Sequence, residues 1–380
     1  MPGRRRPRRF RVRKKRRGPC RWLCSLAPSP RRRHVGVGAD HIREGCSMTG
    51  RSEPSQETMR SALALACRAP SVHNSQPWRW KLAEHSVQLY ADRSRLLPVL
   101  DPLGREMVIS CGAGLHHARV AFAAEGWRPI VHRVPNPAQP DHLASIEFSR
   151  LSEVDDEAVR LAAVAVDRHT DRRPFLPDPV PPDLLESLRV FAHSAGARLV
   201  LVSDESTRRE VELAIQHAGS VERARPEYRR ELAEWSGTHV LAEGVPARSL
   251  PERSPYPRGM AERDFGEVAE GELPVPVLDD GAVLAVLATG GDTVSDWLGA
   301  GEALSAVLLA ATREGLATCP LSQVSEVAEA RDQVCRQVLG GAGVPQLVVR
   351  VGWPVTGEFP AVHTHRRPLS ESVEPLFADR

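Results

Sequence analysis

Lysine is almost absent from this sequence, which draws nearly all of its positive charge from arginine. Of the 51 basic residues only three are lysines, Lys14, Lys15 and Lys81. Arginine is preferred where a forked guanidinium must bind phosphate, but such selection acts at single sites and would not remove lysine from a whole chain. We therefore interpret the bias as the codon usage of a GC-rich genome, and it excludes no class of function.

Paired cysteines, long apolar runs and a phosphate-binding glycine loop are also missing. The seven cysteines show no disulfide spacing, which predicts reduced thiols and a cytoplasmic protein. No apolar run approaches the roughly 18 residues that a transmembrane helix needs, so no membrane association is expected. No G-x-x-x-x-G-K-S/T motif occurs, and the adjacent His116 and His117 would point about 100° apart on a helix, so we predict no metal site.

Positive charge is concentrated at one end of the chain. Residues 1–47 hold 16 Lys+Arg and 2 Asp+Glu, a net of +14, whereas the remainder holds 35 bases and 46 acids, a net of −11. The basic segment has three interpretations: a nucleic-acid-binding arm, a targeting segment, or translated upstream DNA before a true start at Met48. We favour the third because the charge reverses near Met48, and we expect residues 1–47 to be disordered. The acidic body gives no reason to expect nucleic-acid binding.

Hydrophobic periodicity predicts alternating helices and strands in the body. Met59, Leu63 and Ala66 share one helix face, for example, and Pro70 ends that helix. Helices are predicted over residues 56–68, 106–126, 181–195, 205–235 and 297–314, and strands over residues 78–82, 87–90, 129–134, 143–148, 197–203, 283–289 and 346–352. Residues 240–276, which are rich in proline, glycine and charge, are interpreted as a long loop or lid.

Two of the predicted helices resemble each other. Residues 112–126 and 301–315 align at a constant offset of 189, with five of fifteen positions identical. Each segment follows the same coarse order of a helix, a strand and then this helix, so we predict a duplicated unit. The expected fold class is α+β, a mixed sheet covered by helices, built twice in residues 48–160 and 161–380.

The segment PSVHNSQPW, residues 70–78, places short hydrogen-bonding side chains between two prolines that fix φ. It resembles the P-S-x-x-N-x-Q-P-W turn of nitroreductase-like flavoproteins, and every fixed position of that pattern is present. The resemblance implies that Ser71 and Asn74 bind FMN, whose polar groups must be satisfied in a dry pocket because an unpaired one costs about 1–3 kcal/mol. The alternative is an ordinary Asn/Ser turn that anchors a strand.

A second segment, DRHTDRRPF at residues 167–175, resembles the R-x-S-x-R-type stretch with which this family grips the flavin phosphate. The resemblance implies that Arg168, Thr170 and Arg172 bind FMN, with threonine in place of serine. Forked guanidinium donors suit a phosphate that carries nearly two charges. A solvated cluster of charges is the alternative for this stretch taken alone.

Two further segments carry the resemblance toward the end of the chain. GLATCPLSQV, residues 315–324, is similar to the stretch whose backbone N–H faces flavin N5, and it implies that Leu321, Ser322 and Gln323 contact FMN. Gln323 stands where glycine is common in the family. In the terminal segment HTHRRPL, residues 363–369, Arg366 and Arg367 are the counterparts of basic residues that bind the phosphate.

Together these segments imply an FMN-binding oxidoreductase, most similar to the Acg-type branch of the nitroreductase-like proteins. FMN would accept hydride from NAD(P)H and reduce a small electrophile such as a nitroaromatic compound or a quinone, and no catalytic acid or base is implied. The alternative is a protein that sequesters FMN or senses redox state with little turnover, in which residues 240–276 close over the flavin.

The family normally forms homodimers in which each FMN site takes the P-S-x-x-N turn from one subunit and the other parts from its partner. In this chain the first half has PSVHNSQPW, whereas the second half has the arginine stretch, the N5 stretch and the terminal basic residues. In the first half, residues 128–130 stand where we place the counterpart of residues 319–321, and no Ser-Gln follows them. We therefore expect one composite FMN site per chain and a monomer that mimics a dimer.

Overall fold

The structure, a computed structural model, describes residues 53–237, 243–249, 280–355 and 364–376. The predicted disordered tail, residues 1–47, and most of the predicted lid, residues 240–276, lie outside these residues. The boundaries predicted for the two halves, 48–160 and 161–380, stay a prediction.

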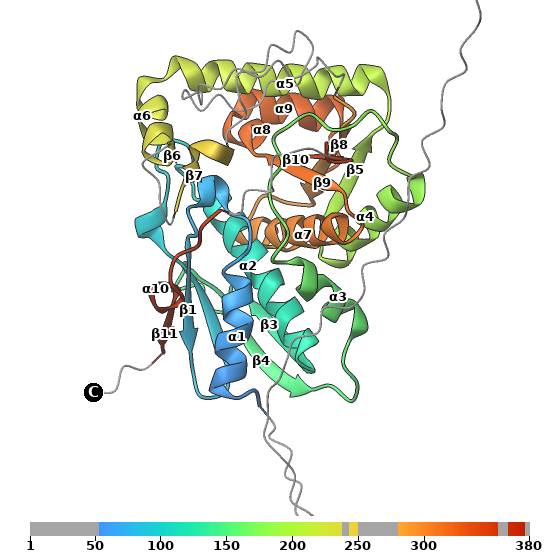
Figure 1. The fold of residues 1–380 in the computed structure, drawn as a ribbon. Helices are drawn as coiled ribbons and strands as arrows, with labels where there is room; N and C mark the ends of the chain where they lie inside the picture. Colours follow the sequence, from blue (N-terminus) through green and yellow to red (C-terminus); the bar gives the residue numbers. More distant parts are fainter. Residues whose placement is uncertain (1–52, 238–242, 250–279, 356–363, 377–380) are drawn as a thin grey trace, which may run out of the picture. The chain divides into compact units, whose positions relative to one another are not determined.

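The first half alternates helices and strands much as its hydrophobic pattern predicts (Figure 1). The helix α1 (Gln56–Ala66) is preceded by Ser55, which caps it because its side chain accepts a hydrogen bond from the Thr58 amide. A short turn, η1 (Val72–Asn74), leads into the hairpin of β1 (Trp78–Leu82) and β2 (Val87–Ala91). After η2 (Arg93–Arg95) the chain forms α2 (Arg105–Ala124), β3 (Trp127–Arg133), β4 (His142–Arg150) and α3 (Asp156–Val164).

The second half repeats this order around two insertions. It begins with α4 (Pro182–Ser194) and β5 (Arg198–Val202), and the first insertion follows as α5 (Glu205–Ala224), α6 (Pro226–Glu234), β6 (Ser236–Gly237), β7 (Val245–Pro246) and η3 (Ala247–Ser249). The repeat resumes with β8 (Val283–Thr289), α7 (Val294–Arg313) and β9 (Ala317–Leu321). A second insertion forms α8 (Gln323–Glu326) and α9 (Ala328–Gln337), and β10 (Val344–Gly352) completes the repeat. The chain then returns to the first half through α10 (Leu369–Ser372) and β11 (Val373–Pro375).

The two large sheets share one strand order. The first runs β11-β1-β2-β4-β3 and the second β5-β8-β10-β9, so that β1, β2, β4 and β3 correspond to β5, β8, β10 and β9. The corresponding pairs are all antiparallel, and β11 adds to β1 in parallel. A one-residue bulge interrupts both ladders at corresponding points, Leu143 of β4 and Gln346 of β10. The shared order and the shared bulge confirm the predicted α+β fold of two tandem half-units.

The ladder registers also show which residues correspond. When the two bulges are superimposed, Ser145 of β4 aligns with Val348 of β10. Ser145 pairs with His132 of β3 and Val348 pairs with Leu321 of β9, so residues 130–132 align with residues 319–321. The offset is again 189, as between the two long helices. Our alignment of residues 128–130 with residues 319–321 was therefore wrong by two positions, because the proline that the two segments share is not structurally equivalent.

The helices α2 and α7 pack against each other between the two sheets, α2 against the first and α7 against the second (Figure 1). At their crossing a Cβ on Gly112 would lie 2.1 Å from the Leu298 carbonyl oxygen, and one on Gly301 would lie 1.9 Å from the Ile109 carbonyl oxygen. Both glycines and both carbonyls are 189 residues apart, so the contact is symmetric, as across the two-fold axis of a homodimer. The backbones of α2 and α7 can come this close because neither Gly112 nor Gly301 has a Cβ.

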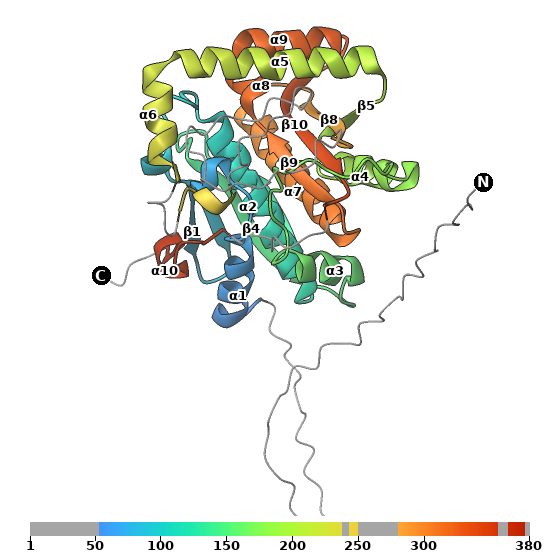
Figure 2. The ribbon, with the colours of Figure 1, turned by 45° about the horizontal axis from the view of Figure 1, so that its top comes forward.

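Further helices complete the core. α5 and α9 lie over the second sheet on the side away from α7 (Figure 2), where Val211, Ala214 and Ile215 of α5 are buried. The first sheet packs its inner side chains on α1 and α2.

Among the described helices α7 alone is long and apolar enough to cross a membrane, and 72% of its apolar window is buried inside the protein.

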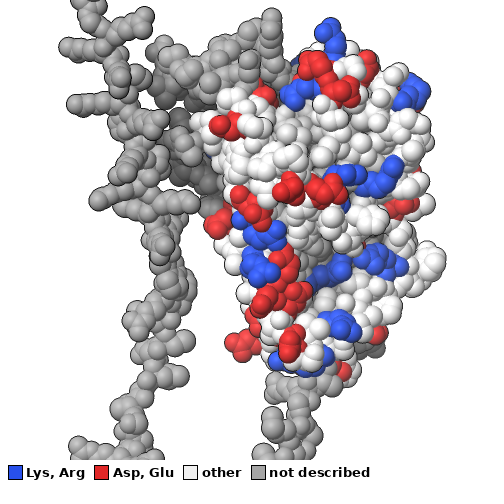
Figure 3. Space-filling view, turned by 90° about the vertical axis from the view of Figure 1, so that its right-hand side faces the viewer, with Lys and Arg blue, Asp and Glu red and all other residues white. Residues whose placement is uncertain are grey.

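Charges of both signs are mixed on the described part of the surface. On the face shown in Figure 3 the Lys and Arg side chains lie among the Asp and Glu side chains. Pairs three residues apart contribute to this mixing, such as Arg160 with Glu157 on α3 and Arg189 with Glu186 on α4. The face shown in Figure 3 therefore has no large area that carries only positive or only negative charge.

Candidate functional site

The turn between α1 and β1 has a strained backbone that its own side chains hold. His73, Asn74 and Gln76 have positive φ angles of 45°, 54° and 50°. For residues other than glycine such a conformation costs about 1–3 kcal/mol each. The Ser71 hydroxyl accepts the Gln76 amide N–H at 3.0 Å, and Gln76 Nε2 donates to the Asn74 carbonyl oxygen at 3.3 Å. These bonds within the turn explain why the segment is so rich in short polar side chains.

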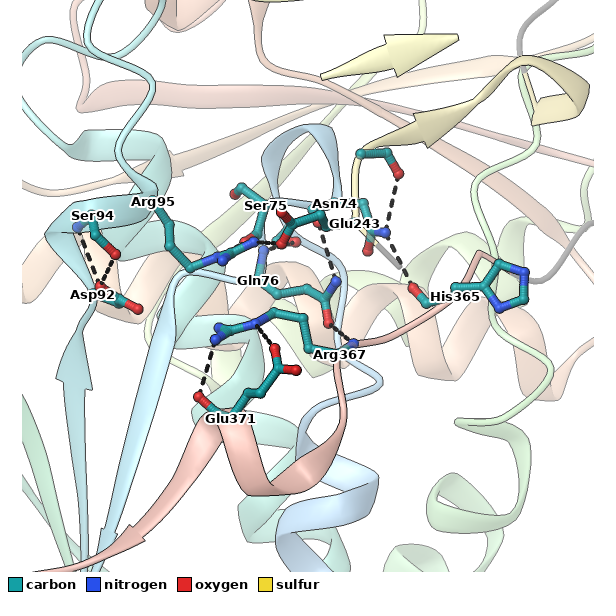
Figure 4. Close-up of polar contacts among 12 residues, drawn as sticks. Asn74, Ser75, Gln76, Asp92, Ser94, Arg95, Glu243, His365, Arg367 and Glu371 are labelled. Atoms are coloured by element: carbon teal, nitrogen blue, oxygen red, sulfur yellow. Dashed lines mark hydrogen bonds and ion pairs between the residues drawn. The ribbon is translucent and has the colours of Figure 1, made fainter. Parts of the chain in front are cut away.

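Two distant segments tie down the same turn (Figure 4). Asn74 Nδ2 donates to the carbonyl oxygens of Gly244 at 3.1 Å and His365 at 3.2 Å, and the Arg367 amide donates to Gln76 Oε1 at 2.9 Å. The Arg367 side chain donates to Glu371, to Oε2 at 3.3 Å and to the carbonyl oxygen at 3.0 Å. In this structure Asn74 therefore fastens the C-terminal segment to the turn, and it does not line the cavity beside the turn.

A cavity of about 110 Å³ lies where the two halves meet. The first half contributes the turn and the start of α2, and the second half contributes the segment before α4 and the end of β9. Six of the predicted FMN-binding residues line it, namely Ser71, Thr170, Arg172, Leu321, Ser322 and Gln323. The cavity is thus composite, with its parts divided between the halves as the sequence indicates.

Two of the four arginines predicted to bind the phosphate, Arg168 and Arg366, lie near the end of α1, just before the turn. Arg366 Nη2 donates to the carbonyl oxygens of Arg68 at 3.1 Å and Ala69 at 3.2 Å, and Pro70, the next residue, lines the cavity. Arg168 is buried, and its Nε and Nη1 atoms have no hydrogen-bond partner. The Nε atoms of Arg68 and Arg366 are likewise buried without a partner. We call Arg68, Arg168 and Arg366 the arginine cluster.

Burial and the repulsion between neighbouring positive charges both act on Arg168 and Arg366 of the arginine cluster. Burial, and after it the charge of Arg68, lowers the pKa of Arg168 to about 10. Burial also lowers the pKa of Arg366 to about 9, with Arg168 and Arg68 as the next causes. Among the described residues no carboxylate forms an ion pair with Arg168. Three guanidinium groups with unused N–H donors fit a dianion such as a phosphate monoester.

The structure adds three residues to the site that the sequence interpretation missed. Arg68 belongs to the arginine cluster, and its place directly before the turn was the available signal. Glu106 and Ser110 project from the first turns of α2 and line the cavity. Ser110 Oγ accepts the Val72 amide at 3.0 Å and donates to the Glu106 carbonyl oxygen at 2.6 Å. In the sequence Glu106 is indistinguishable from the acids that favour any helix N-terminus.

In the first half, protein side chains fill the position that corresponds to the cavity residue Ser322. Ser322 of the cavity corresponds, at the offset of 189, to Arg133 at the end of β3. Arg133 donates through Nε at 2.8 Å and Nη2 at 2.5 Å to Glu302, which is fully buried on α7. Arg119 Nη1 donates to the other oxygen of Glu302 at 3.0 Å. The ion-paired triad of Arg133, Arg119 and Glu302 therefore occupies the place where a second, symmetry-related cavity would have the counterpart of residues 315–324.

Comparisons with known proteins agree with this architecture. The model of the Nitroreductase family matches residues 165–353. Two proteins of Mycobacterium tuberculosis, each named "Putative NAD(P)H nitroreductase", are 40% and 41% identical to the chain. The first alignment covers 84% of this chain and 92% of the relative, and the second, to the relative named acg, covers 83% and 95%.

Solved structures similar to this one are also nitroreductases. An FMN-dependent nitroreductase of Mycobacterium smegmatis in complex with NADPH is 20% identical, with a TM-score of 0.37, and the match covers 59% of this chain and 100% of that one. A nitroreductase of Bacteroides fragilis with bound FMN is 13% identical, with a TM-score of 0.34, and the match covers 52% and 90%.

The chain belongs to the nitroreductase family, because relatives of 40% identity align along most of both chains. The predicted resemblance to the Acg-type branch is confirmed by the relative that carries this name. The predicted class, an FMN-dependent oxidoreductase, comes to the chain with its family.

Proposed function

We propose that this protein binds FMN in the composite cavity and uses it to pass electrons from NAD(P)H to a small electrophile such as a quinone or a nitroaromatic compound. The observation that carries the proposal is the meeting of Ser71, Thr170 and Ser322 at one cavity, next to an arginine cluster with buried N–H donors that have no partner. A flavin mononucleotide has a polar ring edge, a hydroxylated chain and a phosphate, and this arrangement offers a partner for each.

The residues of the chain would divide the binding of FMN among them. The arginine cluster would hold the phosphate, since each of its members has an N–H donor without a partner. Gln323 is buried and its Oε1 atom has no partner, so it can accept a hydrogen bond from a ligand. FMN supplies the hydride chemistry when bound, and the protein binds it, orients it and excludes water.

Rapid mixing of the purified protein with NADPH tests this function. We expect yellow protein whose bound flavin loses its visible absorbance within seconds, and reoxidation when a quinone is added. Flavin that stays oxidised for hours while bound would favour the sequestration alternative. Protein that is purified without flavin, and does not bind added FMN, would contradict both functions.

We further expect one FMN per chain in a monomeric protein. The support is the triad of Arg133, Arg119 and Glu302, in which a buried carboxylate accepts bonds from two guanidinium groups. Separating such a triad to admit a second flavin would leave a charge buried without a partner, at about 3–5 kcal/mol. Acid-released flavin per mole of chain, with light scattering for the mass, measures the ratio. Two FMN per chain, or flavin bound only by a dimer, would refute this expectation.

A further inference from the structure

Glu106 is a buried carboxyl group inside the composite cavity. It extends from the first turn of α2, is 4% exposed, and lines the cavity together with Ser71, Thr170 and Ser322. Its Oε1 atom accepts a hydrogen bond from Ser325 Oγ at 2.8 Å. Ser325 lies on α8, directly after the end of β9, so the second half positions this side chain of the first half.

The groups around Glu106 do not neutralise it. Arg105, its neighbour on α2, donates instead to Asp292 at 2.7 Å and to Gln346 at 2.9 Å. Arg172, on the segment before α4, lines the same cavity and donates to the carbonyl oxygen of Ser249 at 3.1 Å. Within the part of the chain that the structure describes, no cation forms an ion pair with Glu106.

Other titratable groups near Glu106 repel its negative charge. Asp101 lies in the loop before α2, where Oδ2 accepts the Met107 amide at 2.9 Å, and Glu326 lies on α8. His73 also lines the cavity from the turn, but a histidine carries no negative charge and does not add to this repulsion. Burial is the first cause that raises the pKa of Glu106 well above its usual range, and the charges of Glu326 and Asp101 come next. The hydrogen bond from Ser325 and the charge of Arg105 act in the opposite direction and are weaker.

We propose that Glu106 is the proton donor of the composite cavity and protonates the electron acceptor that the reduced flavin attacks. The proposal rests on the proposed function, because it needs FMN and its acceptor in this cavity. Ser325 Oγ also donates to the Ser322 carbonyl oxygen at 2.7 Å, so its single hydrogen is shared between two acceptors. The Glu106 carboxyl group can carry its own proton on Oε2 and donate it to a ligand.

The step balances for a quinone. The acceptor receives one hydride, which is two electrons and a proton, from the reduced cofactor, and one carbonyl oxygen of the quinone receives the proton of Glu106. The O–H bond of Glu106 breaks, an O–H bond forms on the product hydroquinone, and the cofactor is left oxidised. A proton from the solvent returns to the Glu106 carboxylate, so that each turnover consumes one proton, and NAD(P)H reduces the cofactor again. A buried acid with a raised pKa keeps its proton to a higher pH than an exposed glutamate does, as this role requires.

The visible spectrum of bound FMN, followed against pH without any turnover, tests the assignment. In the unchanged protein a charge that appears on Glu106 should perturb the flavin spectrum with an apparent pKa well above that of an exposed glutamate. In Glu106→Gln, which keeps the size and an oxygen for Ser325, this transition should vanish while FMN stays bound. Turnover with a quinone should fall about 10²- to 10⁴-fold in kcat with little change in KM.

Two neighbouring variants keep the proposal testable if Glu106→Gln does not fold. Ser325→Ala removes a bond to the carboxylate and should raise the apparent pKa, whereas Glu326→Gln removes a negative neighbour and should lower it. A transition that persists in Glu106→Gln, or that moves in neither neighbouring variant, would overturn the proton donor alone. Unchanged protein that holds no flavin would overturn the proposed function and this inference with it.

Discussion

Gly301→Ala should lower the free energy of unfolding by about 3 kcal/mol or more, although it adds a single methyl group. The new Cβ would lie 1.9 Å from the Ile109 carbonyl oxygen, a backbone atom that no rotamer change can move. The two long helices would have to separate, and the side chains packed around their crossing would lose contacts. Urea unfolding of the flavin-free protein should show the loss as a lower midpoint.

The same helix offers a matched control two residues away. A Cβ on Gly299 would have no heavy atom within 4 Å, and the position lies inside α7. Gly299→Ala should therefore stabilise the protein by about 0.5–1 kcal/mol, since alanine loses less backbone entropy than glycine in a helix. The two substitutions should move the midpoint in opposite directions, and equal midpoints for both would refute the contact at the crossing.

Arg168→Met should have opposite effects on the flavin-free protein and on FMN binding. Arg168 is 7% exposed, and two of its nitrogen atoms have no partner, so its charge is desolvated without compensation. Removing that charge should stabilise the flavin-free protein by about 1–3 kcal/mol. Losing a charge-assisted bond to the phosphate should weaken FMN binding by about 1.5–3 kcal/mol, roughly 10- to 150-fold.

Thermal unfolding with and without FMN separates the two effects. The variant should melt at a higher temperature than the unchanged protein when flavin is absent, and FMN should raise that temperature by less. Arg150→Met is the control, because Arg150 is exposed and stacks on Trp127 with 4.7 Å to the ring centre, away from the cavity. Equal stabilisation by FMN of both variants would refute the assignment of Arg168 to the phosphate.

The sequence predicted well those parts of the fold whose signal is local. The strand β8 has the predicted bounds 283–289, and α1 begins at the predicted residue 56. α3 and α9 are short amphipathic helices that the sequence interpretation did not recognise. No strand was predicted at β9, which contains Pro320. The structure places β9 at the edge of its sheet, where proline is tolerated.

The site was predictable where one motif contained the information and not where distant segments meet. The family pattern pointed to Ser71, Thr170 and Ser322, and the structure brings them to one cavity. The contact of Asn74 with Gly244 and His365 joins residues 170 and 291 positions apart, and no local pattern specifies it. Glu106 was missed for the same reason, since Ser325 and Glu326 reach it from α8, and Ser325 is 219 positions away in the sequence.

The parallel pairing of β11 with β1 has a consequence for biosynthesis. Val373 pairs with Trp80, and the Leu376 amide donates to the Leu82 carbonyl oxygen at 2.7 Å. At translation rates of about 5–20 residues per second, roughly 15–60 s separate the synthesis of these two strands. The first sheet waits through that interval with the β1 edge open, and an open edge can pair with another chain. Arg366, which completes the arginine cluster, is synthesised in the same late segment as β11. The first half is therefore translated early but completes its sheet and its arginine cluster only after that segment has been made.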